Sequence, residues 1–170
     1  MIYIGIDPGL NGAVGVLKSH GSTYVDPGSI QVFDTPTMLV SGIKEKRVYN
    51  TVAMALLLKP FVDQVCDDVL CVLESVHSMP KQGVASSFSF GQGLGMWQGI
   101  IAAMGFPLEM PSPQRWKKEM LADQGKDKDA SRFKAIALFP SLAEQLSRKK
   151  DDGRAEAILL AEYGRRLRSR

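Results

Sequence analysis

Two short apolar runs, each ended by an acidic residue, most constrain the fold of this chain. Ile2-Tyr3-Ile4-Gly5-Ile6 leads into Asp7, and Val69-Leu70-Cys71-Val72-Leu73 leads into Glu74. The second run is typical of a strand buried on both faces of a sheet. We therefore expect a sheet with helices on its faces and with acidic side chains where two of its strands end.

Turn residues and periodicity place the other elements around these two strands. The turn at 7–12 predicts a hairpin with a strand at 13–17, residues 30–34 alternate like a third antiparallel strand, and 107–110 suit a short edge strand. Capping and breaker signals predict six helices. Three are expected at 49–65 with an interruption at Pro60, at 88–104, and from Ser112-Pro113 onward. The other three are expected at 129–138, from the capping box Ser141–Glu144 onward, and from Asp152 or Gly153 to Leu167. The pattern predicts an α/β fold, and the absence of a linker predicts one domain over residues 1–170.

Composition excludes several classes of protein. With 45% hydrophobic residues and a net charge of +3, the chain is not of the intrinsically disordered class. No apolar run approaches the roughly 20 residues needed to span a bilayer. We expect a cytoplasmic setting without a targeting peptide, because Met1 leads straight into a strand and two cysteines make neither a disulfide framework nor a metal quartet. A mature organellar form remains an alternative.

The charge is divided unevenly along the chain. Residues 1–110 hold six Lys or Arg against nine Asp or Glu, whereas residues 111–170 hold fifteen against nine. Such asymmetry indicates a polyanion-binding face, and a solvated helical surface with a basic tail explains it equally well.

Four carboxylates form the candidate chemical site. Asp7 and Glu74 follow strands, while Asp152 and Glu156 lie four residues apart on one face of the last helix. Each has a structural explanation, as a turn residue, a strand terminator or a helix cap, and Asp151 is assigned to capping or to the preceding loop. Together they are the hard oxygen ligands that suit Mg²⁺ or Mn²⁺, and two such ions about 4 Å apart can hydrolyse a phosphodiester.

The start Ile4-Gly5-Ile6-Asp7-Pro8-Gly9, the strand-end Glu74 and the acidic last helix resemble the RuvC family of Holliday junction resolvases. The stretches 31–36, 138–142 and 148–157 are similar to the branch that includes the plant plastid resolvase and its bacterial or phage relatives. The resemblance implies a ribonuclease H-like fold with a five-stranded sheet of order 3-2-1-4-5. It also implies a homodimer that makes paired symmetric nicks in a four-way DNA junction during recombination and repair.

The resemblance also assigns site residues. Asp7, Glu74, Asp152 and Glu156 would hold two Mg²⁺ or Mn²⁺ ions per active site, and Lys128, or alternatively Lys126, would be the catalytic lysine. The similar branch carries His where this chain has Asp152, and other RuvC proteins have Asp where this chain has Glu156, so Asp151 stays an alternative ligand. No small-molecule cofactor and no membrane are expected.

DNA contacts and the dimer are expected from other segments. The stripe Phe90, Leu94, Trp97, Ile101 and Met104 has heptad-like spacing, so it either packs on the sheet or joins two copies through the adjacent Gly91, Gly95 and Gly99. The remaining expected DNA contacts are aromatic, polar or basic: Lys81 and Gln82 for base choice, Phe88 and Phe90 for stacking, and Arg115, Lys117, Lys118, Lys126, Arg132, Lys134, Lys149, Lys150 and Arg154 for phosphates.

Two other functions compete with junction cleavage. Sugar kinases and actin-like ATPases also open with an Ile-Gly-Ile-Asp-x-Gly turn, but they need two lobes and a much longer chain than 170 residues. A catalytically weak junction-binding protein is the alternative if the departure at Asp152 disables the metal site.

Overall fold

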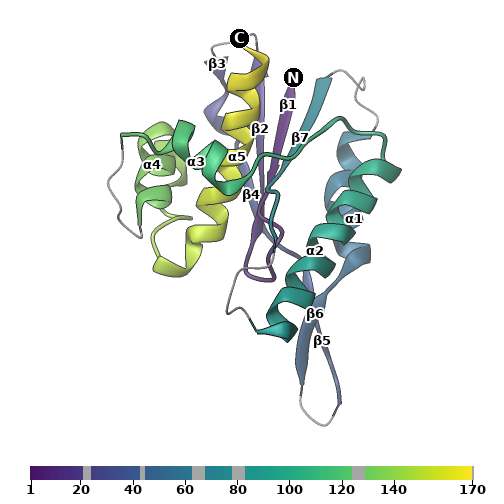
Figure 1. Cartoon of the computed structure of the whole chain (residues 1–170). Helices are drawn as coiled ribbons and strands as arrows, with labels where there is room; N and C mark the ends of the chain where they lie inside the picture. Colours follow the sequence, from purple (N-terminus) through teal and green to yellow (C-terminus); the bar gives the residue numbers. More distant parts are fainter. Residues whose placement is uncertain (21–23, 43–44, 63–67, 78–82, 124–128, 170) are drawn as a thin grey trace.

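The structure is a computed structural model, and it describes residues 1–20, 24–42, 45–62, 68–77, 83–123 and 129–169. A central sheet lies between two groups of helices: α3, α4 and α5 cover one face, and α1 and α2 cover the other (Figure 1). The sheet has six strands: β1 (Ile2–Ile6), β2 (Ala13–His20), β3 (Tyr24–Val25), β4 (Gln31–Asp34), β7 (Val69–Leu73) and β8 (Leu108–Glu109).

The order of the five main strands is β4-β2-β1-β7-β8, which confirms the predicted order 3-2-1-4-5. Strand β2 pairs antiparallel with β1 and with β4, whereas β7 is parallel to β1 and to β8. The short β3, which the sequence pattern did not predict, pairs with the end of β2.

The helices are α1 (Thr51–Leu58), α2 (Val84–Ala103), α3 (Pro113–Met120), α4 (Ala130–Leu138) and α5 (Asp152–Arg168). Helix α3 begins as predicted, because the Ser112 hydroxyl accepts a hydrogen bond from Arg115 N at 3.3 Å and Pro113 occupies the first helical position. Helix α2 begins at Val84, before the predicted Phe88. No helix among the described residues is long and apolar enough to cross a membrane.

Two sequence predictions were wrong. The helix expected over 49–65 differs in its described part: Tyr49 ends strand β6 (Lys46–Tyr49), α1 stops at Leu58, and Pro60 lies in a 3-10 turn at Lys59–Phe61. Residues 63–65 lie outside the described residues. Strand β6 pairs with β5 (Thr37–Val40) in a separate hairpin that the pattern did not predict. The capping box at Ser141 starts no α-helix, because Pro140–Leu142 forms a 3-10 turn instead.

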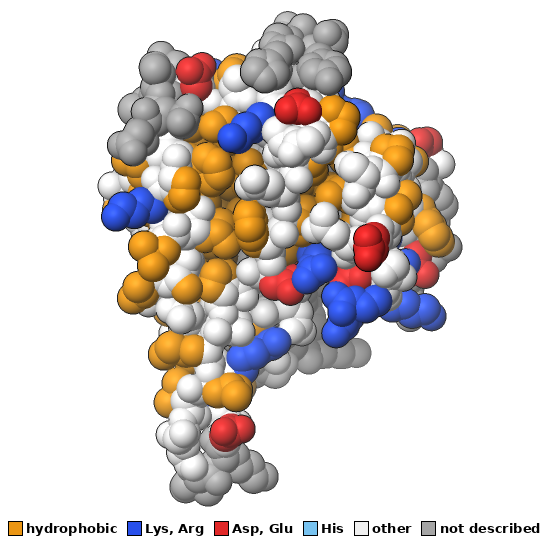
Figure 2. Space-filling model, turned by 180° about the vertical axis from the view of Figure 1, so that it is seen from behind, with side chains coloured by type: hydrophobic (Ala, Val, Ile, Leu, Met, Phe, Trp, Pro, Cys, Tyr) orange, Lys and Arg blue, Asp and Glu red, His pale blue; other side chains and the backbone are white. Residues whose placement is uncertain are grey.

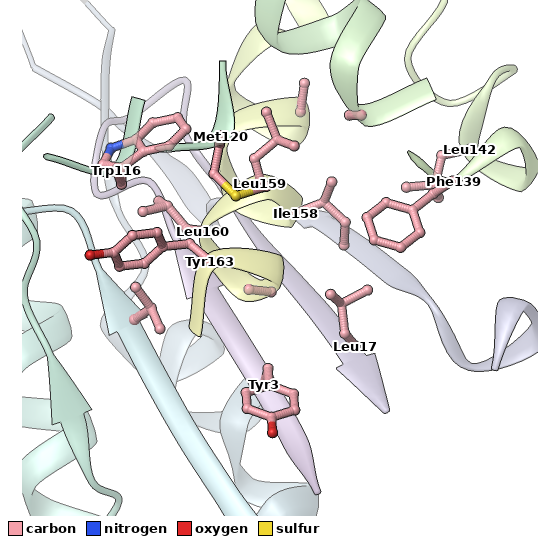
Figure 3. Packing of buried hydrophobic residues seen from close by; sticks show 14 of the residues in the cluster. Tyr3, Leu17, Trp116, Met120, Phe139, Leu142, Ile158, Leu159, Leu160 and Tyr163 are labelled. Atoms are coloured by element: carbon pink, nitrogen blue, oxygen red, sulfur yellow. The ribbon is translucent and has the colours of Figure 1, made fainter. Parts of the chain in front are cut away.

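Alternate side chains of β1 and β2 point to opposite faces of the sheet and belong to two hydrophobic cores. On the face of α1 and α2, Ile4 and Val16 pack with Trp97 and Ile101, so these two members of the α2 stripe are core residues. On the opposite face, the side chains shown in Figure 3 gather between the sheet and helix α5. They include Tyr3, Leu17, Trp116, Ile158 and Tyr163.

Helix α5 lies directly on the sheet because two paired strand residues have no side chain. Gly5 of β1 is opposite Gly15 of β2. A Cβ at Gly15 would lie 2.7 Å from Ile158 N and 2.8 Å from Ala157 C, and one at Gly5 would lie 2.9 Å from Leu160 C. These are backbone atoms, so no rotation of a side chain can make room.

We expect Gly15→Ala to lower the free energy of unfolding by at least about 2 kcal/mol, because overpacking a dense core costs roughly 1–3 kcal/mol and α5 must move as a whole. Urea unfolding of both proteins measures the change. Gly28→Ala is the control, since its Cβ would meet only Asp26 Oδ1 at 3.5 Å on the surface, and it should stay within about 1 kcal/mol of the wild type. A Gly15→Ala protein with wild-type stability would contradict the close packing of α5.

Candidate active site

Asp7 and Glu74 lie side by side at the carboxyl ends of two parallel strands. The register pairs Ile6 with Leu73, so each acid is the next residue after a paired position. Glu74 N donates a hydrogen bond to Ile6 O at 3.1 Å, and Asp7 N donates to Ala13 O at 3.0 Å. Both acids are therefore fixed by main-chain bonds at one edge of the sheet.

Helix α5 brings a third acid, Glu156, to the same edge. Its first turn packs on the β1–β2 turn, where a Cβ at Gly153 would lie 2.5 Å from Asn11 O, 3.0 Å from Gly12 Cα and 3.1 Å from Asp7 Oδ2. Only glycine at position 153 allows this approach. The packing places the acidic face of α5 next to the turn that carries Asp7.

Helices α3 and α4 supply polar partners for two of the acids. The Trp116 indole nitrogen donates to Glu74 Oε1 at 2.8 Å in a buried hydrogen bond. Lys117 Nζ forms an ion pair with Glu156 Oε1 at 2.7 Å, and the Ser131 hydroxyl donates to the same oxygen at 3.2 Å. These contacts hold Glu74 and Glu156 while Asp7 keeps a weaker bond, from Gly9 N to Oδ1 at 3.4 Å.

Burial and neighbouring acids raise the pKa of Asp7 and of Glu74. Burial, followed by the charges of Glu156 and Glu74, raises the pKa of Asp7 to about 7, although Gly9 N and Lys117 act in the opposite direction. Burial also raises the pKa of Glu74, with Glu156 adding to the shift and the Trp116 hydrogen bond opposing it. Three carboxylates thus share a partly buried site with a shortage of positive charge.

Asp152 lies apart from Asp7 and Glu74. Burial raises its pKa, and the charges that act on it are those of Arg132, Asp129, Glu156 and Asp151. Its Oδ1 is buried and has no hydrogen-bond partner among the described residues. The charges that act on Asp152 thus include those of Arg132 in α4 and of Asp129 at the N-cap of α4, whereas Asp7 and Glu74 are not among them.

Asp151 is committed to another contact. Its oxygens accept hydrogen bonds from Arg148 N at 2.8 Å and from the Arg148 guanidinium at 2.7 Å, and these bonds lower its pKa. It occupies the N-cap position of α5, as expected, although its side chain makes no capping bond. Between the two acids that the sequence left open, Asp152 is the one available for a ligand.

The donor chemistry fits a divalent cation. Carboxylate oxygens are the ligands that Mg²⁺ and Mn²⁺ prefer, and a cation would relieve the repulsion that raises the pKa of Asp7. Within the described ranges, no three Asp, Glu, His or Cys side chains stand close enough together to hold one ion. The negative charge of the site therefore favours a metal ion. In this structure, however, Trp116 holds Glu74, and Lys117 and Ser131 hold Glu156.

The expected DNA contacts have different environments. Arg115, Lys118, Lys149 and Lys150 are exposed, as are Phe88 and Phe90. Lys117 is paired with Glu156, and the Arg154 guanidinium donates to both oxygens of Asp34 at 2.6 and 2.7 Å. Lys134 Nζ is paired with Asp123 at 2.6 Å. The expected residues Lys81, Gln82, Lys126 and Lys128 lie outside the described residues.

Arg132, which the sequence predicted as a phosphate contact, is buried and bonded within the fold. It is 7% exposed and donates to Leu146 O at 3.0 Å, to Ser147 O at 3.4 Å and to Asp129 Oδ1 at 2.9 Å. These bonds join α4 to the segment before α5, so Arg132 stabilises the fold. The Asp129 side chain bonds Arg132 and makes no capping bond to α4.

Sequence reasoning missed three residues of the site. Trp116 and Ser131 contact Glu74 and Glu156 across 42 and 25 residues of sequence, and neither lies in a motif that indicates such a bond. Gly153 follows Asp152 directly, and its position between two acids of one helix was the available signal.

The raised pKa of Asp7 predicts how stability depends on pH without metal. Below about pH 4 the carboxyl is protonated in the folded and the unfolded chain. Between pH 4 and 7 only the folded protein keeps the proton, so the contribution of Asp7 to the free energy of unfolding falls as pH rises, and the loss is complete above pH 7. In EDTA, Asp7→Asn should therefore melt above the wild type at pH 8, with a difference that shrinks toward pH 4. A difference that does not vary with pH would refute the shift.

Comparison with known proteins gives relatives in sequence and in structure. No family model matches the chain. The chain is 35% identical over 85 residues, half of its length, to the protein named Holliday junction resolvase MOC1, chloroplastic, from Chlamydomonas reinhardtii. It spans only 10% of that relative's length.

The solved structures show the same fold. RuvC of Thermus thermophilus matches with a TM-score of 0.60 at 14% sequence identity, over 99% of this chain and 98% of that one. A second structure, T. thermophilus RuvC in complex with a Holliday junction substrate, matches with a TM-score of 0.62 at 14% identity, over 99% and 97% of the two chains. The ribonuclease H-like fold expected from the sequence is confirmed. The chain is thus similar in sequence to MOC1 over half of its length, and it shares the fold of RuvC.

Proposed function

We propose that residues 1–170 form one nuclease domain that resolves four-way DNA junctions by paired symmetric nicks. The observation that carries the proposal is the group of Asp7, Glu74 and Glu156 at one edge of a RuvC-like sheet, where burial, with the charges of Glu156 and Glu74 adding to it, raises the pKa of Asp7 to about 7. The MOC1 relative is named a Holliday junction resolvase, and the RuvC match was solved with a junction substrate. Both support DNA junctions as the substrate.

In this proposal Asp7, Glu74, Asp152 and Glu156 hold two Mg²⁺ or Mn²⁺ ions. Such ions activate a water and stabilise the leaving oxygen of a phosphodiester. Trp116 orients Glu74 through its indole N–H, and Lys117 with Ser131 orients Glu156. Lys128, or alternatively Lys126, is proposed as the catalytic lysine because of the family resemblance.

The arrangement of the acids also favours a second candidate, a junction-binding protein that cleaves weakly. Lys117 already occupies an oxygen of Glu156, and Asp152 is displaced toward Asp129 and Arg132. Nicking of a synthetic four-way junction in Mg²⁺ separates the two functions.

We propose the cytoplasm as the first candidate for the compartment in which the protein works. An organelle, as for the chloroplastic relative, is the second candidate.

Helix α2 supports the proposed homodimer. Its twenty residues include no Lys, Arg, Asp or Glu, although much of its outer face is exposed. Around Gly91, Gly95 and Gly99 there is open space, with no atom within 4 Å of an added Cβ. An exposed helix without charge is typical of a surface that another protein covers, and two symmetric nicks need two active sites.

Asp7→Asn should separate cleavage from binding. Removing the carboxylate deletes a proposed metal ligand, so nicking in Mg²⁺ should fall by at least about a thousandfold, or roughly 4 kcal/mol of barrier. Junction affinity in EDTA should stay the same or improve, because one negative charge near the scissile phosphate has gone. Asp26→Asn removes a surface acid and serves as the control, with nicking unchanged. If Asp7→Asn nicks at the wild-type rate, the metal-site assignment is wrong.

A bulky charge on the open face of α2 should break the proposed dimer. We expect wild-type protein to sediment as a dimer at micromolar concentration and Gly95→Arg to sediment as a folded monomer, since an unpaired charge in an interface is costly. Gly28→Arg adds the same group to an exposed loop and should leave the dimer intact. A monomeric wild-type protein would count against the dimer itself.

A further inference from the structure

The hairpin formed by β5 and β6 stands apart from the central sheet. Its register pairs Leu39 with Arg47 and Thr37 with Tyr49. It projects from the lower end of the molecule in Figure 1, below α2, and pairs with no strand of the main sheet among the described residues. Each strand of four residues spans about 10–13 Å, a length over which duplex DNA carries several phosphates.

Two side chains on one face of β6 attach the hairpin to the turn that carries Asp7. Residues two apart on a strand share a face, so Arg47 and Tyr49 point the same way. The buried Tyr49 hydroxyl donates to Pro8 O at 3.2 Å, and Arg47 Nη2 donates to Asn11 Oδ1. The base of the hairpin therefore lies at the margin of the candidate active site.

Helix α2 makes room for this attachment through Gly93. A Cβ at Gly93 would lie 2.5 Å from Pro8 O and would collide with the Tyr49 ring. The hairpin, the Asp7 turn and α2 thus meet at one buried joint, which fixes the direction in which the hairpin projects.

Among the described residues, the hairpin exposes two basic side chains and one acidic side chain at its second strand. Residues 44–47 read Lys-Glu-Lys-Arg, and Glu45, Lys46 and Arg47 are all exposed. Lys and Arg side chains appear at the lower end of the molecule in Figure 2, at the base of the hairpin and across from it on the body. The acids at the hairpin base repel DNA, so a cationic element beside them is complementary to the phosphates that flank a cleaved bond.

We infer that the β5–β6 hairpin is a DNA-binding arm, in which Lys46 contacts the phosphates of the junction arm next to the cleavage site from one face of β6, and Arg47, held to Asn11 through Nη2, contacts them from the other face with its remaining N–H groups. The inference rests on the proposed function, since it takes the Asp7 turn as the point where the scissile phosphate binds. A two-stranded ribbon fits the geometry of a duplex groove, and the exposed Met38, Leu39 and Val40 lie on the strand that pairs with the basic one.

The salt dependence of junction binding tests this inference. Binding of a synthetic four-way junction is measured in EDTA for wild type, Lys46→Ala, and the double variant Lys46→Ala with Arg47→Ala. Each lost phosphate contact should reduce the slope of log affinity against log salt by about 0.9, and affinity at 0.15 M salt by roughly fivefold. The double variant should therefore lose about 30-fold. Lys46→Ala alone keeps the bond from Arg47 to Asn11 and should lose roughly fivefold.

A matched control removes two positive charges elsewhere. Lys18→Ala with Lys59→Ala changes two exposed lysines outside the hairpin and the turn, and should change the affinity by less than twofold. If this control loses as much junction affinity as the hairpin double variant, the overall charge of the protein explains binding, and the assignment of the hairpin as a DNA-binding arm is wrong. If the hairpin variants keep the wild-type slope, or become monomeric with that slope, the hairpin does not contact DNA.

Nicking by the wild type in Mg²⁺ is measured separately and tests the proposed function. If the hairpin variants lose DNA affinity but the wild type never nicks a junction, the proposed nuclease function is wrong and DNA binding by the hairpin is supported. If the wild type nicks the junction but the hairpin variants bind DNA with wild-type affinity, the proposed nuclease function is supported and DNA binding by the hairpin is wrong.

Discussion

The structure depends on the direct contact between helix α5 and strands β1 and β2 at Gly5 and Gly15. Backbone atoms of α5 occupy the space that any side chain at these positions would need. The contact buries Ile158, Leu159 and Leu160 against the sheet, and it also sets where the helix begins relative to the β1–β2 turn. The same packing that forms one core therefore fixes the distance between Asp7 and the acids of α5.

The site itself opposes folding, because its acids are partly buried close to one another. Such groups are tolerated when hydrogen bonds and opposite charges offset the desolvation. Here the offsets come from α3 and α4, through Trp116 on Glu74 and through Lys117 and Ser131 on Glu156. Asp7 accepts only a weak hydrogen bond from Gly9 N, and burial together with the charges of Glu156 and Glu74 raises its pKa to about 7. The helices on this face thus hold the acids in place as well as filling a core.

Local patterns predicted the main strands, the start of α3 and both ends of α5 to within a residue, because apolar runs, turn residues and caps act over a few neighbouring residues. The strand order came from the resemblance to the RuvC family. The same patterns put Asp7 and Glu74 at one sheet edge, since parallel strands end together, whereas Glu156 reaches that edge through the packing of α5. They did not predict the β5–β6 hairpin, because Pro36 suggested the end of a strand region and residues 49–58 gave a helical signal across Tyr49. Arg132 and Trp116 were misread or missed because their partners lie 14 and 42 residues away, a separation at which sequence spacing carries no geometric information.

Because Glu156 lies on α5, it is synthesised after Asp7 and Glu74, so the acidic site is completed late in translation. Asp7 and Glu74 leave the ribosome well before residues 152–168, and until then β1 and β2 have two glycines facing water where the helix will rest. A nascent chain therefore carries an incomplete set of acids on an incomplete core. The proposed nuclease would therefore be unable to cut DNA while it is still being translated, because Glu156, which completes its acidic site, belongs to the helix that completes its packing.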